Sequence, residues 1–270
     1  PISLLDDSST PFDRLAAQTA AAEAGPLVTV IMTCSNPGPE LFTAVRSVIA
    51  QSYQHWELLL IDDGSPRGIA STLKKIAALD PRIRTIRNTS AAGKFVRTNE
   101  ALDLAQGEFV TMHEAHAWAH PRRLEIQVQH LLANPGQLAN VVNTVGVDEE
   151  LSFVGRPGSA MFVAEASLMF RRQEVLKSVG YFDSVKAGAD REFRKRLQRS
   201  TGVTVPVVLA GAPLIFTLEH ERIPSERQNG ISLWNRPERD FYWSGVRRFR
   251  QRIEADEASP LVKFPQADRP

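Results

Sequence analysis

Apolar runs and amphipathic segments alternate along the first half of the chain. Four apolar runs predict strands. They lie at 27–35, 56–65, 82–88 and 108–114. The segments between and after them have helical spacing of apolar residues, or glycine and proline at their ends, and predict helices. These cover 39–53, 69–79, 98–107 and 121–135. Short alternation of strand and helix predicts an α/β fold, with a mostly parallel sheet and helices on both faces.

The second half of the chain has a less regular pattern. Strands are expected from Phe153 onward, followed by a helix from about Arg172 to Val179. The segment 188–200 begins with a glycine and predicts another helix. The apolar stretch 203–218 contains two prolines and predicts strands with a bend. The tail at 239–254 predicts a basic helix that carries aromatic residues.

The first 25 residues differ from the rest of the chain. Thr10 is a candidate N-cap, Pro11 suits the first helical position, and several alanines come after them. We therefore expect a short N-terminal helix or linker at 1–25. The predicted organisation continues with a main domain at 26–220 and a helical extension at 221–270.

Composition excludes several classes of protein. The chain has 270 residues, with 32 Lys and Arg against 31 Asp and Glu, so no overall charge favours nucleic acid. The single cysteine, Cys34, cannot form an internal disulfide. No stretch approaches the roughly 18 uninterrupted apolar residues of a membrane span, and no signal peptide is visible. We expect a cytoplasmic protein, either free or peripheral to the inner face of the membrane.

Polar residues follow the ends of three predicted strands. They are Thr33 to Asn36, the pair Asp62 and Asp63, and Glu114 to His116. Ligands of such sheets bind beyond the carboxyl ends of the strands, which makes these residues the candidate site. No GxGxxG follows the first strand, and "AAGKF" (91–95) lacks the upstream glycine and the Ser or Thr of a P-loop.

Several segments, in order, resemble family 2 glycosyltransferases. The opening "VTVIMTCSNPGPELFTAVRSVIAQSYQHWELLLIDDGSPRG" carries the resemblance, which "NEALDLAQGEFV", "AWAHPRRLEIQV" and "LMFRRQEVLKSVGYFDSVKAGADREFRKRL" continue. The resemblance covers roughly residues 26 to 200, and more weakly the tail is similar to bacterial members that build surface polysaccharides. It implies the Rossmann-like A-type glycosyltransferase fold. It also implies transfer of a sugar from a nucleotide-diphosphate donor, with inversion, to a glycan or related acceptor.

The resemblance implies roles in donor binding. In the family an aspartate of the "DDGS" segment binds the uracil or ribose, which here is Asp62 or Asp63; a simple turn is the alternative, since Asp-Gly favours turns. Family members commonly carry Arg or Lys before the asparagine of the next helix, where this chain has Thr98. The full donor-binding set is Thr33, Asp62, Asp63, Lys94 and Asn99. Within it Lys94 would supply the missing cation, since Arg97 is expected to face elsewhere.

The resemblance also assigns the base. An inverting transferase needs a carboxylate that takes the proton of the acceptor hydroxyl. The family aspartate matches Asp190. A helix cap is the alternative for Asp190, and Glu192 is the second candidate for the base.

The metal motif departs from the family. Where members have Asp-x-Asp, this chain has Glu114 and His116. Residues two apart in a strand share a face, so both can point at one cation. The resemblance implies Mn²⁺ or Mg²⁺ bridging the donor diphosphate, and an imidazole suits Mn²⁺ better. His220 is a third candidate ligand, with a surface histidine as the alternative. A hydrolytic zinc site is disfavoured, because Ala117 stands where HExxH requires histidine.

Two functional hypotheses remain open. The first is an inverting glycosyltransferase of polysaccharide biosynthesis that uses a UDP-sugar or similar donor. The second is a catalytically impaired relative that binds a nucleotide, a glycan or a partner domain. The basic run 247–252 is a solvated helix face or a contact for anionic lipid, acidic polysaccharide or a partner domain. Tyr242 and Trp243 would stack on a sugar or pack in the core.

Overall fold

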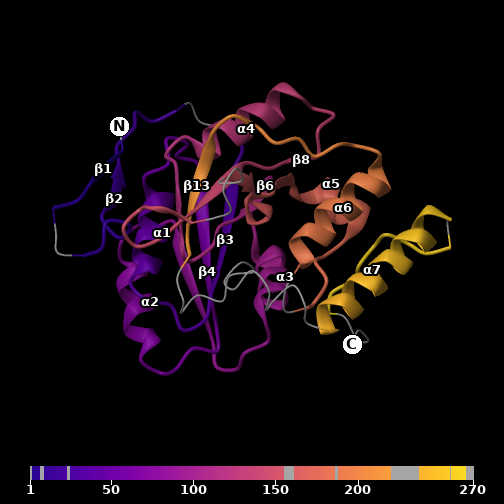
Figure 1. Ribbon diagram of the computed structural model, residues 1–270, viewed down its shortest axis with the longest axis horizontal. Helices are drawn as coiled ribbons and strands as arrows, with labels where there is room; N and C mark the ends of the chain where they lie inside the picture. Colours follow the sequence, from indigo (N-terminus) through magenta and orange to yellow (C-terminus); the bar gives the residue numbers. More distant parts are fainter. Residues whose placement is uncertain are drawn as a thin grey trace.

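A six-stranded sheet forms the centre of the molecule (Figure 1). The computed structural model describes residues 2–6, 9–22, 25–154, 161–185, 188–219, 237–255 and 257–265. The strand order is β5 (Ile83–Asn88), β4 (Trp56–Asp63), β3 (Val28–Cys34), β6 (Phe109–Met112), β12 (Met169–Arg171) and β8 (Ala139–Asn140). The first four strands are parallel, which confirms the predicted βα units, whereas β12 runs antiparallel to both β6 and β8.

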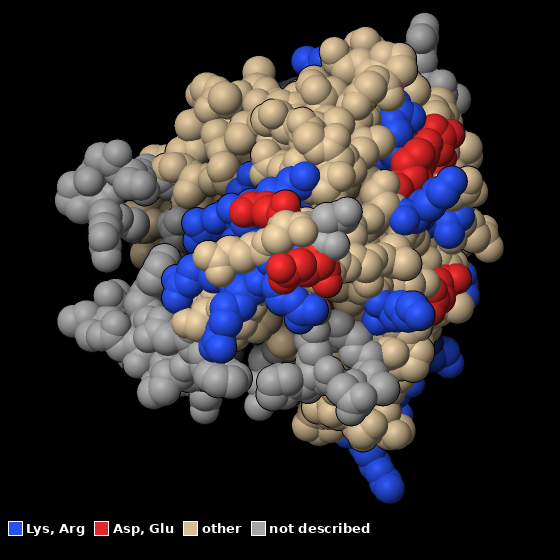
Figure 2. Space-filling view, turned by 90° about the vertical axis from the view of Figure 1, so that its right-hand side faces the viewer, with Lys and Arg blue, Asp and Glu red and all other residues tan. Residues whose placement is uncertain are grey.

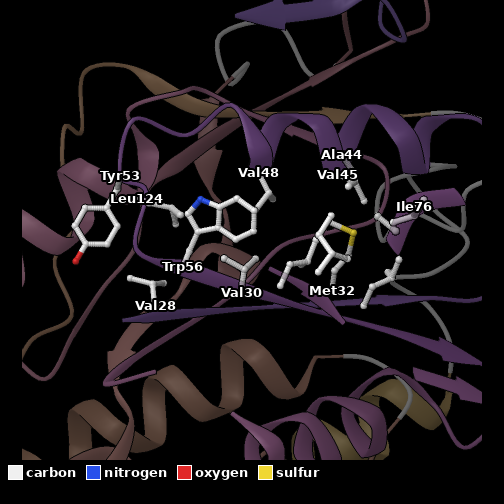
Figure 3. Close-up of a cluster of buried hydrophobic side chains, with 14 of the residues drawn as sticks. Val28, Val30, Met32, Ala44, Val45, Val48, Tyr53, Trp56, Ile76 and Leu124 are labelled. Carbon is white, nitrogen blue, oxygen red and sulfur yellow. The ribbon is translucent and has the colours of Figure 1, made fainter. Parts of the chain in front are cut away.

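Helices cover both faces of this sheet. One face carries α1 (Glu40–Ile49), α2 (Ile69–Ala77) and α4 (Arg123–Ala133). The other carries α3 (Lys94–Leu104), α5 (Arg172–Val179) and α6 (Ala189–Thr201). Alternate residues of a strand point to opposite faces, so Val30 and Leu58 join the first core and Ile31 and Leu59 the second. Figure 3 shows Trp56 in the first core, with Val48 of α1 above it and Val30 of β3 below.

A smaller mixed sheet packs beside the first. Its order is β10 (Phe153–Val154), β9 (Asn143–Val147), β13 (Pro213–Leu218) and β7 (Ala117–Ala119), and β11 (Met161–Val163) also pairs with β9. The 3₁₀ turn η1 (Glu165–Ser167) then leads to β12. Because β7 begins directly after residues 113–116, which come after the end of β6, these residues form the corner between the two sheets.

The N-terminal segment is not a helix in the described residues, so the helix predicted there is wrong, whereas the predicted role as a linker stays a prediction. It forms two antiparallel strands, β1 (Ile2–Leu4) and β2 (Leu15–Ala17). Thr10 does accept the N–H of Asp13 at 3.2 Å, but only one turn is formed. Phe12 and Leu15 are buried in a cluster with Trp118. Burial of these side chains outweighs the helix propensity of the neighbouring alanines.

The C-terminal helix α7 (Pro237–Glu254) packs on α6. Tyr242 donates a hydrogen bond to Asp183 at 3.0 Å, and Trp243 lies over Gly188. Both side chains therefore pack against the rest of the protein, which was one of the two roles expected for them. Arg247, Arg248 and Arg252 of the basic run are exposed. None of the helices in the described ranges is long and apolar enough to cross a bilayer.

Candidate active site

A pocket lies at the carboxyl ends of β3 and β6, where the parallel strands stop. It is a small cavity of about 70 Å³ that opens to solvent. It is lined by Ile31, Thr33, Lys94, Thr98, Met112, His113, Glu114, Ala115, His116 and Ala166. Four of the residues expected from the sequence therefore meet here: Thr33, Lys94, Glu114 and His116. They come from β3, the start of α3 and the corner after β6.

The turn after β4 places Lys94. Asp63 accepts the N–H groups of Ala92 and Gly93 at 2.7 and 2.9 Å, and so fixes the loop immediately before α3. Gly64 has φ +74°, and a Cβ there would lie 2.4 Å from the nitrogen of Ala91. Only glycine allows this approach of the two loops. As the first residue of α3, Lys94 is thereby directed to the pocket.

Asp63 also forms a buried ion pair. Arg97 donates to its carboxylate at 2.9 Å and to Glu100 at 2.8 Å, so Arg97 faces away from the pocket as expected. Burial raises the pKa of Asp63, but hydrogen bonds from Ala92, Arg97 and Gly93 outweigh it and leave that pKa below its usual value. Asp63 stays ionised and organises the start of α3.

Asp62 lies on the opposite face of β4. It is fully buried, and its Oδ1 accepts the N–H of Ser65 at 3.3 Å. Its Oδ2 is buried without a hydrogen-bond partner in the described structure. Burial, with the two aspartates as smaller causes, raises the pKa of Cys34 to about 12, so the thiol stays protonated. A buried carboxylate oxygen without a partner is costly unless a ligand or water satisfies it.

Lys94 lies between two carboxylates from distant segments. Its Nζ is 3.4 Å from Glu114 Oε1 and 4.0 Å from Asp190 Oδ2. Burial raises the pKa of Glu114, but Lys94 and then His116 outweigh it, so this pKa is lowered and Glu114 is ionised at neutral pH. One cation and two anions therefore face one another at the pocket.

Asp190 and Glu192 differ sharply in their surroundings. The N-cap of α6 is Gly188 and no side chain caps the helix, so Asp190 does not serve as the cap. Glu192 is buried and paired with Arg196 at 3.0 Å. Burial raises the pKa of Glu192. Of the two candidates for the base, Asp190 is the one near Lys94 and Glu114.

Phe182 joins the helix that carries Lys94 to the helix that carries Asp190. Its ring stacks on Phe95 of α3 at 5.8 Å and on Phe193 of α6 at 4.0 Å. Asn99 accepts the Phe182 N–H at 3.0 Å and donates to the Phe182 carbonyl at 2.9 Å. Asn99 is fully buried and both ends of its amide bond to Phe182, so the structure shows a positioning role for this side chain, and its predicted contact with the donor stays a prediction.

The residues at the corner provide a poor metal site. Glu114 Oε2 and His116 Nε2 lie 3.8 Å apart and could share a cation. No group of three His, Cys, Asp or Glu suited to a metal occurs in the part of the chain that the structure describes. Lys94 already brings a positive charge to the same carboxylate, which opposes a second cation. His220 lies outside the described residues. This donor set does not fit a metal held by the protein alone.

His113 is committed elsewhere. Its Nε2 lies 3.0 Å from the carbonyl oxygen of Ala117, and its Nδ1 faces Arg123 at 3.1 Å. Burial, together with the charge of Arg123, lowers the pKa of His113 to about 3, so the ring is neutral. His113 is therefore part of the wall behind the pocket.

Arg123 is a residue that the sequence prediction missed. It is buried at 1% exposure, and its hydrogen bonds go to neutral groups: His113, Thr111, Met112, Ser167 and Gln127. Burial lowers its pKa to about 9, so it is still charged at pH 7. The sequence did contain a signal for its burial. Arg123 stands four residues before Gln127 and eight before Leu131, so it lies on the buried face of α4.

Several known proteins resemble part of this chain in sequence. Putative glycosyltransferase EpsE from Bacillus subtilis is 36% identical over 108 residues, which is 40% of this chain and 39% of EpsE. UDP-Glc:alpha-D-GlcNAc-diphosphoundecaprenol beta-1,3-glucosyltransferase WfgD from Escherichia coli is 28% identical over 154 residues, 57% of this chain and 56% of WfgD. The matched segments span less than two thirds of either relative.

A solved structure has the same architecture. Mannosyltransferase PcManGT from Pyrobaculum calidifontis, in complex with GDP-Man and Mn²⁺, matches with a TM-score of 0.56 and 19% identity. The match covers 82% of this chain and 61% of that chain, and it confirms the predicted A-type glycosyltransferase fold. The family model for glycosyl transferase family 2 matches residues 29–196. That match covers more than half of the chain, which therefore belongs to glycosyl transferase family 2.

Proposed function

We propose that this protein is an inverting glycosyltransferase of polysaccharide biosynthesis. One observation carries the proposal: Lys94, Glu114 and Asp190, from three separate segments, meet at the carboxyl edge of the parallel sheet. A cation at that edge suits the diphosphate of a nucleotide sugar. A carboxylate within 4.0 Å of it suits the proton transfer that accompanies attack.

The donor would lie across the ends of β3 and β4. We assign the nucleoside to the end near Asp62 and Asp63, and the diphosphate to the pocket lined by Thr33 and Lys94. Asp62 contributes a buried carboxylate oxygen without a partner, and Asp63 holds the loop before α3. UDP is the proposed nucleotide because the name of WfgD specifies UDP-Glc; the complex of PcManGT with GDP-Man makes GDP the second candidate.

Asp190 would act as the base. The acceptor hydroxyl attacks the anomeric carbon, its proton passes to the Asp190 carboxylate, and the bond from that carbon to the diphosphate oxygen breaks. The nucleoside diphosphate leaves with the bonding electrons, and attack from the opposite side inverts the anomeric centre. Preorganised positive charge stabilises the leaving group as its negative charge grows.

The acceptor would be a glycan or a lipid-linked sugar. The support comes from WfgD, whose name describes the transfer of glucose to a GlcNAc on diphosphoundecaprenol. A divalent ion, Mn²⁺ or Mg²⁺, has weaker support: PcManGT was solved with Mn²⁺, but the described residues here offer only Glu114 and His116. The alternative, an impaired binding module, is less favoured. Lys94 places a cation at the pocket, which compensates for the threonine at position 98, where family members commonly have Arg or Lys.

Donor binding is tested first. The protein is unfolded thermally with UDP, GDP or AMP, each with and without Mn²⁺. A ligand at one hundred times its Kd stabilises the folded state by about 2.7 kcal/mol. We expect UDP or GDP to raise Tm by several degrees and AMP, which lacks the diphosphate, to leave it unchanged. If neither diphosphate shifts Tm under any condition, the proposal fails.

Catalysis is tested at Asp190. Transfer from a UDP-sugar panel to lipid-linked sugar acceptors is measured for the wild type and for Asp190→Asn. Loss of a general base typically lowers kcat about 10²- to 10⁴-fold, while the Kd for UDP should stay within about threefold. Asp6→Asn, at an exposed site, is the matched control. Unchanged kcat in Asp190→Asn would exclude this residue as the base.

A further inference from the structure

We propose that the Lys94 ammonium supplies the positive charge for the donor diphosphate, so that donor binding does not require a divalent metal. This inference rests on the proposed function. It concerns how the pocket binds the diphosphate, and it assigns to Lys94 the neutralisation of negative charge that a metal ion would otherwise provide.

The position of Lys94 is the first argument. Its Nζ lies next to Glu114, at 3.4 Å, where a cation bound by the corner after β6 would also have to lie. Asp63 fixes the loop that leads into Lys94, and Phe95, the next residue, is held by its stack on Phe182. The base of this side chain is therefore held at both neighbours, and its ammonium needs little reorganisation to meet a ligand.

The donor set is the second argument. Glu114 is the carboxylate at the corner, and His116 adds one imidazole at 3.8 Å. His113 is committed to Ala117 and Arg123. A metal would have to share Glu114 with the Lys94 ammonium, which lies 3.4 Å from that carboxylate, and two cations bound to one carboxylate repel each other in a partly buried site.

Charge balance is the third argument. Glu114 and Asp190 are negative, and Lys94 alone would leave the pocket with a net negative charge. Arg123 lies directly behind the wall formed by His113, 3.1 Å from that ring, and its described hydrogen-bond partners are all neutral. Because no anion among the described residues neutralises the charge of this buried cation, its positive electrostatic potential extends to the pocket and favours the binding of an anion there. Lys94 makes the direct contact and Arg123 offsets the second carboxylate.

Binding calorimetry in metal-depleted buffer tests the inference. UDP and GDP are titrated into the full chain in EDTA and then, without chelator, in Mn²⁺ or Mg²⁺. For the wild type we expect a Kd in EDTA within about threefold of the value in metal. For Lys94→Met we expect a Kd in EDTA at least about tenfold weaker, since a charge-assisted hydrogen bond is lost. Lys94→Arg should bind within about threefold of the wild type.

Two further variants make the result specific. Lys75→Met, on the exposed side of α2, is the matched control and should bind as the wild type does. Glu114→Gln removes the anion that holds Lys94. If Lys94 is the cation, loss of its carboxylate partner leaves more of its charge for the diphosphate, and nucleotide binding in EDTA tightens in Glu114→Gln. If Glu114 is a metal ligand that the donor needs, binding in Mn²⁺ weakens in this variant. Thermal unfolding verifies that each variant is folded.

The outcomes separate this inference from the proposed function. Wild-type binding that requires Mn²⁺ or Mg²⁺ overturns the inference and leaves the transferase proposal standing. Lys94→Met that binds as tightly as the wild type in EDTA also overturns it. No nucleotide binding by the wild type with or without metal overturns the proposed function, and the inference with it.

Discussion

At the scale of single residues, Asp63 connects the stability of the fold to the geometry of the pocket. Its carboxylate accepts two backbone N–H groups before α3 and pairs with Arg97. An isolated aspartate at a strand end indicates only a turn or a ligand. The structure adds a role that needs Arg97, 34 positions further along the chain.

Asp63→Asn should make the protein less stable and change how its stability depends on pH. The folded-state pKa of Asp63 lies below its ordinary value, so the ionised carboxylate stabilises the fold at neutral pH. That contribution is lost as pH falls from about 4 through the lower folded-state value. We expect a loss of about 2–3 kcal/mol at pH 7, and a smaller difference from the wild type at pH 3. Urea unfolding at both pH values measures it; an equal difference at both would contradict the role of the charge.

Sequence reasoning located the site residues that stand at strand ends and missed those defined by distant partners. Glu114 and Lys94 could be predicted, because the ends of parallel strands meet at one edge. The role of Asn99 could not, because its partner Phe182 is 83 positions away. Arg123 was missed because a basic residue at a helix start is usually solvated, and its neutral partners come from separate segments of the chain.

At the scale of elements, helices and strands with tertiary support followed their patterns. The helix predicted from Arg172 to Val179 forms with those bounds. The predicted N-terminal helix failed because its local signals, a cap and alanines, are weaker than burial of Phe12 and Leu15. The antiparallel direction of β12 was also not predictable, since short strands carry no directional code.

Gly64→Ala should disturb both stability and nucleotide binding. The positive φ and the approach to the backbone of Ala91 leave no room for a Cβ. We expect a loss of about 2 kcal/mol or more in unfolding free energy and a weaker Kd for UDP, because the loop before Lys94 must move.

Two glycines provide controls for Gly64. At Gly202, φ is +69° but a Cβ would meet nothing within 4 Å, so Gly202→Ala measures the backbone cost alone. At Gly68 neither constraint applies, and Gly68→Ala should be neutral or slightly stabilising. If Gly64→Ala costs no more than Gly202→Ala, the close contact between the loops is not limiting.

At the scale of the whole molecule, basic side chains gather on the side that carries α7. Figure 2 views that side and shows Lys and Arg together, with Asp and Glu between some of them. Arg247, Arg248 and Arg252 are exposed, whereas Arg250 is buried. Contact of this face with an anionic membrane or a partner domain stays a proposal.

Vesicle sedimentation tests the membrane version of that proposal. We expect the wild type to sediment with vesicles that contain anionic lipid and not with neutral ones. Each basic residue near such a surface contributes about 1 kcal/mol, so Arg247→Gln, Arg248→Gln and Arg252→Gln together should weaken binding by about two orders of magnitude. These exposed changes should leave Tm nearly unaltered. Equal sedimentation with both kinds of vesicle would exclude an electrostatic contact.

The stack of Phe95, Phe182 and Phe193 has a consequence for working conditions. Lys94 and Asp190 sit on helices joined by three aromatic rings and the amide of Asn99, none of which carries a charge. Added salt weakens attraction between exposed charges but hardly affects ring packing. High salt should therefore weaken nucleotide binding while leaving the spacing of the two helices unchanged, so that KM rises at lower salt concentrations than those at which kcat falls.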